Sequence, residues 1–217
     1  METISDPLLD LAAVRVDAVA LAFPLLSGLG NAALSGPRAD ALAAVDAGRL
    51  ALSMLAGCAL RGNASIIASG IEFPGGAGLA PGWNAVALTR RERELVTGCL
   101  LAHLSASGLP QVVSMRGAPS LHPSRVERAD WTIEDGRFFG DLLDDVQVMA
   151  ACRGAGHLVQ PPPAGLVDRI CTEPDPIYPK ITRCGLTNAG GCDDICAGSH
   201  CAVHGEQFAA IAAWVTP

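Results

Sequence analysis

The densest group of reactive side chains lies near the C-terminal end of the chain. Cys192, Cys196, Cys201 and His204 follow one another with three, four and two intervening residues. Zinc prefers tetrahedral sulfur and nitrogen ligands, so these four side chains could together hold a zinc ion. The spacing differs from that of a familiar zinc finger, and Cys184 would be left over. Disulfide bonds are therefore the favoured interpretation, and a zinc site is the alternative.

Eight cysteines allow four disulfides, and such bonds persist mainly in oxidising compartments. The disulfide candidates are Cys58, Cys99, Cys152, Cys171, Cys184, Cys192, Cys196 and Cys201. We expect a bridge between Cys58 and Cys99 that joins two helices, and Cys152 with Cys171 is a plausible second pair. The remaining connectivity cannot be deduced from the sequence.

The N-terminal residues lack the pattern of a signal peptide, which begins with basic residues before its apolar run. Acidic residues follow Met1 instead. The apolar run from Val16 to Leu29 contains Asp17 and Pro24, and it is shorter than the roughly 20 residues of a membrane span. We expect no membrane span, and a mature exported chain whose signal was removed and to which Met1 was added. The alternative is a cytosolic protein with free thiols or a metal.

Three other groups of residues could carry a function. Cys99 and His103 lie four residues apart on one expected helix and could form a nucleophilic pair, unless Cys99 is bridged. His157, His200 or His204 could work with carboxylates near the cysteine-rich tail in a hydrolase or a metal-dependent enzyme. The tryptophans Trp83 and Trp131 would offer a sugar-binding or protein-binding platform if exposed, and would be core residues if buried.

The overall charge argues against nucleic-acid binding. The chain has 15 basic and 22 acidic side chains, for a net charge of -7, and only 4% aromatic residues. Nucleic-acid binding depends on cationic contacts with phosphate, so an acidic chain is a poor candidate. Half of the residues are hydrophobic, which indicates a folded chain.

The elements expected to position these residues indicate an α+β protein. A helical N-terminal half precedes short strands and a disulfide-rich, loop-rich C-terminal segment. Thr89, with Glu92 three residues later, is a capping box and begins the clearest helix, which we expect to end near Ser107. The expected helices are one that starts at Pro7, residues 38–58, the capped helix and residues 138–148. The expected strands are residues 63–73, 111–115 and 131–133, and residues 208–215 are either a strand or a helix.

The chain divides into two unequal parts. Residues 1–36 form an apolar N-terminal segment, and the stretch from Leu26 to Gly36 looks like an eroded short repeat. Residues 37–217 are expected to form a single α+β domain whose cysteine-rich tail starts at about residue 150.

Several stretches resemble uncharacterised exported cysteine-rich proteins of myxobacteria and related bacteria. The stretches are Gly78 to Trp83, Leu95 to His103, Arg116-Gly117, and Glu134 to Leu142, followed by the cysteine-rich tail. The resemblance covers roughly residues 50 to 217. It implies export and disulfide bonds, and it implies no activity.

The sequence therefore predicts an exported protein of the periplasm, cell surface or extracellular space, stabilised by disulfides and without a cofactor. We expect a non-enzymatic binding or structural component of the cell surface. Its partner would be a protein, a surface polymer, or another copy reached through the apolar N-terminal segment. The alternative is the secreted hydrolase or metal-dependent enzyme.

Overall fold

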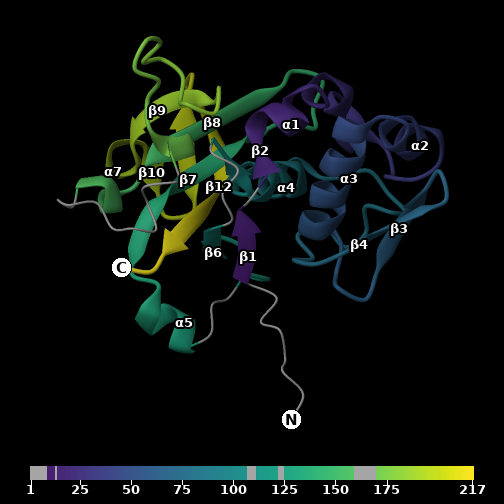
Figure 1. The fold of residues 1–217 in the computed structure, drawn as a ribbon, viewed down its shortest axis with the longest axis horizontal. Helices are drawn as coiled ribbons and strands as arrows, with labels where there is room; N and C mark the ends of the chain where they lie inside the picture. The colour runs from purple at the N-terminus through teal and green to yellow at the C-terminus, as the bar shows by residue number, and fades with distance from the viewer. Residues whose placement is uncertain (1–8, 13, 107–110, 122–124, 159–169) are drawn as a thin grey trace.

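The computed structural model describes residues 9–12, 14–106, 111–121, 125–158 and 170–217 (Figure 1). Helices and strands are mixed, which confirms the α+β class. The helices are α1 (Val16–Ala20), α2 (Pro37–Ala43), α3 (Asp46–Ala59), α4 (Arg90–Ala102), α5 (Arg125–Asp130) and α7 (Cys192–Ile195). Short 3-10 turns are η1 (Phe23–Leu26), η2 (Leu29–Asn31), η3 (Ala155–Leu158) and η4 (Ile170–Thr172). None of the helices in this described part of the chain is long and apolar enough to cross a membrane.

One sheet organises most of the described strands. Its strands are β1 (Leu9–Ala12), β6 (Gln111–Arg116), β12 (Glu206–Val215), β7 (Ile133–Asp141), β8 (Val148–Arg153) and β9 (Thr187–Gly191), hydrogen-bonded in that order. Strand β11 (His200–Val203) joins the sheet on β12, and β10 (Cys196–Ala197) pairs with β11. Two separate pairs complete the strands, β2 (Val14–Arg15) with β5 (Leu104–Ser105) and β3 (Ser65–Ala68) with β4 (Ile71–Pro74).

Strand β12 changes its neighbour part-way along its length. Residues 212–214 pair with β6, whereas residues 206–209 pair with β11, on the edge opposite β7. At the change of neighbour, the backbone N–H of Ala210 donates to the carbonyl of Ser199 at 2.8 Å. The end of β6 and the turn before β11 therefore meet beside the middle of β12.

Helix α4 covers one face of the sheet and lies between the sheet and α3 (Figure 1). Its capping box forms as expected, since the backbone N–H of Glu92 donates to the Thr89 hydroxyl and the Thr89 N–H donates to the Glu92 carboxylate. A Cβ on Gly98 would lie 2.7 Å from the carbonyl oxygen of Phe138. This contact shows how closely the helix approaches β7.

The apolar N-terminal segment contributes to the same core. Val19, Leu26 and Leu34 are fully buried and belong to the core cluster that also contains α3 and α4 residues. These three side chains pack within the chain, whereas Leu21 and Leu25 of the same segment are exposed.

A smaller second core covers the opposite face of the sheet. Phe139 and Phe208 pack there with Cys152, Cys192 and Cys201. Phe138 and Phe139 are adjacent in β7, and their side chains point to opposite faces, which is why they belong to the two different cores.

Several expected elements are wrong in type or extent. The helix expected to start at Pro7 is replaced, in its described part, by β1, β2 and the short α1. Residues 138–148 are not a helix, because β7 continues to Asp141 and a bend leads into β8. Residues 63–73 form a hairpin, whose turn holds Ser69 and Gly70 at positive φ. For residues 208–215, where a strand and a helix were alternatives, the strand is confirmed: β12 is paired on both edges, although its alanines favour a helix.

Candidate functional site

An arginine-lined cleft lies where β12 changes its neighbour. The cavity has a volume of about 500 Å³, and its lining residues are Arg91, Arg116, Gly117, Ala118, Pro119, Leu121, Arg128 and Ser199. A second cavity, beside α7, measures about 300 Å³ and contains Asp193 and Asp194 together with Arg153. The larger cavity differs in that its described lining residues include three arginines and no carboxylate.

Arg91 lies in the first turn of α4, and the two other arginines of that turn, Arg90 and Arg93, form ion pairs. The Nε of Arg90 donates to Glu94 at 2.7 Å, and Arg93 binds Asp141 and Asp144 at 2.8 and 3.0 Å. Arg91 is exposed and makes no ion pair with any residue that the structure describes. A cation in the first helical turn is unfavourable beside the positive end of the helix dipole. Arg91 therefore adds to a positive potential that already exists at this helix end.

Arg116 is the last residue of β6 and is held in a fixed position. Its guanidinium carbon lies 4.4 Å from the centre of the Trp214 ring, within the range of a cation–π contact. One of its terminal nitrogens donates to the carbonyl of Trp131 at 2.9 Å. Because the stack and the hydrogen bond restrict the side chain, little conformational entropy is lost when the guanidinium binds an anion.

Arg128 and Ser199 complete the polar wall from two other segments. Arg128 lies on α5 and is exposed, without an ion pair to a described residue. Ser199 sits in the turn between β10 and β11, which the hydrogen bond from Ala210 fixes against β12. Ala118 and Leu121 are almost fully buried and give the cavity an apolar part.

This set of side chains suits a carboxylate or a phosphate. A guanidinium stays charged at any physiological pH and offers paired donors that match the two oxygens of such a group. The Ser199 hydroxyl can add a further donor. The apolar part of the cavity can contact the uncharged body of the same ligand.

Two buried polar groups lie on the sheet face that carries Arg116. Ser114 is two residues before Arg116 in β6 and pairs directly with Trp214. The Ser114 hydroxyl and the Trp214 indole N–H are buried and have no hydrogen-bond partner among the described residues.

The expected histidine and carboxylate cluster exists around His157. Its Nε2 lies 3.0 Å from Asp135 and 3.1 Å from the Thr172 hydroxyl, while its Nδ1 lies 3.4 Å from Glu173. Asp135 and the Thr172 hydroxyl therefore compete for a hydrogen bond with the same nitrogen, Nε2 of His157. Thr172 is fully buried, so no substrate can reach its hydroxyl in this structure. The hydrogen bonds of this buried cluster connect β7, η3 and η4.

The other two histidines of the tail are not brought into this cluster. His200 lies in β11, and His204 is exposed in the turn between β11 and β12 at a φ of 52°. Cys152, and not His204, is the side chain that lies with Cys192 and Cys196. All three cysteine sulfurs are in disulfides and carry no thiolate to ligate zinc. The proposed zinc set is therefore wrong for this structure.

All eight cysteines are paired. The expected bridge between Cys58 and Cys99 is confirmed, whereas the pairing of Cys152 with Cys171 is wrong. The remaining bonds are Cys152–Cys192, Cys171–Cys184 and Cys196–Cys201. Strand β8 lies beside β9, and α7 follows β9 directly, which brings Cys192 to Cys152.

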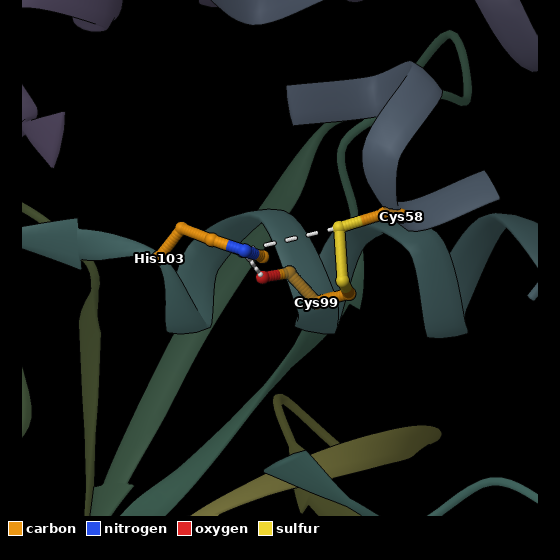
Figure 2. A group of neighbouring side chains, drawn as sticks. All are labelled: Cys58, Cys99 and His103. Atoms are coloured by element: carbon orange, nitrogen blue, oxygen red, sulfur yellow. Dashed lines mark hydrogen bonds between the residues drawn. A yellow bond between two sulfur atoms is a disulfide. The ribbon is translucent and has the colours of Figure 1, made fainter. Parts of the chain in front are cut away.

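Figure 2 shows why Cys99 and His103 do not form a nucleophilic pair. Cys99 is bonded to Cys58, and a bridged sulfur has no thiolate. The Nδ1 of His103 lies 2.7 Å from the Cys99 carbonyl oxygen and 3.9 Å from the Cys58 sulfur. The imidazole thus donates to a carbonyl in the last turn of α4, where such groups lack a helical partner.

The two tryptophans expected to bind a partner are in different environments. Trp83 is fully buried, and its indole N–H donates to the carbonyl of Ala32 at 3.1 Å, so it is a core residue. Trp131 is partly buried and contributes its carbonyl to Arg116. The interpretation of Trp83 as a binding platform is wrong. Trp131 lies beside the arginine-lined cleft, where its backbone carbonyl accepts a hydrogen bond from Arg116.

The sequence interpretation did not single out Arg91, Arg128 or Ser199. These residues are far apart in the chain, and no local motif connects them. A helix that begins with three arginines within four residues is the one signal that points to α4. Comparisons with protein-family models, curated proteins and solved structures found no match.

Proposed function

We propose that this protein is an exported, disulfide-stabilised binding component of the cell surface that holds an anionic group of its ligand in the arginine-lined cleft. The observation that carries the proposal is the meeting of Arg91, Arg116 and Arg128 around one cavity. Two of these arginines have no ion pair within the described structure. Their charges are therefore available to a ligand.

The charge of the whole chain supports a small anionic group and not a long polyanion. The net charge is -7, so the long-range field repels extended polyanions such as nucleic acids. Within the cleft the nearby guanidinium groups dominate, because salt screens charges more than about 8–10 Å away. A ligand with one or a few carboxylate or phosphate groups can use the cleft without meeting that repulsion.

The lining favours binding over catalysis. It supplies three permanent cations and one hydroxyl, which orient an anion. Proton transfer in an enzyme uses a group such as histidine or a carboxylate. The His157 cluster is buried around Thr172 at a different place in the fold, whereas the Nδ1 of His200 lies 3.5 Å from the Ser199 hydroxyl of the cleft. The four disulfides agree with export, because such bonds persist in oxidising compartments.

Isothermal titration of the full-length protein with inorganic phosphate, with citrate and with an uncharged sugar of similar size tests this proposal. We expect saturable binding of one anion per chain, no binding of the sugar, and weaker binding as salt rises. The preferred anion distinguishes a phosphate ligand from a carboxylate ligand. Equal affinity for the charged and uncharged probes, or no binding of either anion at low salt, would contradict the proposal.

A further inference from the structure

Two disulfides of the cysteine-rich tail lie in direct contact. The sulfur of Cys152, which is bonded to Cys192, lies 3.6 Å from the sulfur of Cys196, which is bonded to Cys201. The sulfurs of Cys152, Cys192 and Cys196 all lie within 4.8 Å of one another. The three residues come from β8, α7 and β10, so the fold and not sequence proximity alone brings them together.

The four cysteine residues differ in their exposure to solvent. Cys152 is fully buried, and Cys192 and Cys201 are 3% and 1% exposed. Cys196 is partly exposed and lies directly opposite Cys201 across the β10–β11 pair. Thiol–disulfide exchange requires access of a thiolate to a sulfur atom. Cys196 is therefore the entry point for a thiol from outside.

From this arrangement we infer that the tail is a thiol–disulfide exchange site, in which Cys196–Cys201 accepts electrons from an external dithiol and Cys152–Cys192 exchanges with it internally. The inference is independent of the anion-binding proposal, because the cleft plays no part in the reaction.

The reaction has two balanced steps. In the first, a dithiol reduces Cys196–Cys201 to two thiols and becomes a disulfide itself, so two electrons enter the protein. In the second, the Cys196 thiolate attacks the Cys152 sulfur, a Cys152–Cys196 bond forms, and Cys192 leaves as a thiolate that takes up a proton. The second step changes no oxidation state.

The product differs from the starting protein in its disulfide connectivity. One disulfide then joins β8 directly to β10, and Cys192 and Cys201 are free thiols. Because Cys192 begins α7, the exchange releases that helix from β8 while the link from β8 to the tail is kept. A pair of disulfides that were only structural would stay in place or be reduced independently.

The full-length Cys201→Ser variant tests the second step alone, because it leaves Cys196 as a thiol beside an intact Cys152–Cys192 bond. After alkylation, a protease that cuts at Asp193 and Asp194 separates Cys192 from Cys196 for mass spectrometry. We expect the alkyl label on both Cys192 and Cys196, together with a peptide that joins Cys152 to Cys196. A label on Cys196 alone, with Cys152–Cys192 as the only bond of that pair, would overturn the inference.

The Cys184→Ser variant is the matched control. It frees Cys171, which belongs to no comparable group of sulfurs among the described residues. We expect the label to stay on Cys171.

The wild-type protein provides a second measurement that does not depend on how the variants fold. Less than one equivalent of dithiothreitol is added to the native protein before alkylation. We expect joint labelling of Cys192 and Cys201 with a Cys152–Cys196 cross-link. Labelling of only Cys196 and Cys201 would overturn the inference.

Discussion

The guanidinium of Arg116 stacks on the indole ring of Trp214, with 4.4 Å between the guanidinium carbon and the ring centre. Arg116 ends β6, and Trp214 lies two pairs further along the neighbouring strand. The stack holds one cation of the cleft in place before any ligand arrives. Trp214 thus acts on the ligand through Arg116 and is a positioning residue.

Two substitutions of Trp214 distinguish the contribution of its ring face to anion affinity from that of its indole N–H. In Trp214→Phe an aromatic face remains for Arg116 and the unpaired N–H is removed, so we expect phosphate or citrate affinity to change less than about threefold. In Trp214→Leu the face is lost, and we expect a larger loss, on the order of three- to tenfold, from a cation–π contact of about 0.5–2 kcal/mol. Calorimetry of both variants measures the difference, and equal affinities would show that the stack does not position Arg116.

The close approach of α4 to the sheet predicts opposite effects for two glycines. A Cβ on Gly98 would lie 2.7 Å from the Phe138 carbonyl oxygen, so Gly98→Ala should lower the free energy of unfolding by about 1–3 kcal/mol. A Cβ on Gly57 in α3 would meet nothing within 4 Å. Gly57→Ala should raise the free energy of unfolding by about 0.5–1 kcal/mol, because alanine is the better helix former. Denaturant unfolding measures both, and equal effects would place the helix further from β7.

Asp141 predicts a particular pH dependence of stability. Burial raises the pKa of Asp141 and outweighs Arg93, whose hydrogen bond and charge lower it, and the charge of Asp144 raises it further. Between the ordinary Asp pKa of about 3.9 and the raised value, the folded protein keeps a proton that the unfolded chain releases. The stabilising contribution of this group is complete below the ordinary pKa and is lost as pH rises through the raised pKa.

The Asp141→Asn variant cannot titrate at this position and isolates the effect. We expect the stability of the wild type relative to this variant to fall as pH rises across that window. Denaturant unfolding of both proteins at matched ionic strength follows the difference. A wild type that gains stability relative to the variant with rising pH would show that Arg93 outweighs burial.

Features that depend on nearby residues could be predicted from the sequence. The capping box at Thr89 and Glu92 located the start of α4, because both partners lie within one turn. The bridge between Cys58 and Cys99 spans 41 residues, but each cysteine lies on a helix that local patterns predict, and that was enough to suggest the pair.

Features that depend on distant segments could not be predicted. Residues 138–148 were expected to form a helix, but Phe138 and Phe139 each support a different core on a two-sided strand whose partners are β8 and β12. Cys152 pairs with Cys192 because β8 lies beside β9, which the spacing of cysteines does not encode. The cleft joins side chains from α4, β6, α5 and the β10–β11 turn, and no local pattern relates these four segments.

The two arginines of the cleft without described ion pairs provide the most direct test of anion binding. Arg91→Ala and Arg128→Ala each remove one exposed charge, and Arg153→Ala removes an exposed charge outside the cleft. The measurement is the affinity of each variant for inorganic phosphate and citrate by calorimetry at low salt. We expect a three- to tenfold loss for each cleft variant, the range for a partly solvated charge-assisted hydrogen bond, and little change for Arg153→Ala. Equal losses in all three variants, or none in the cleft variants, would contradict this expectation.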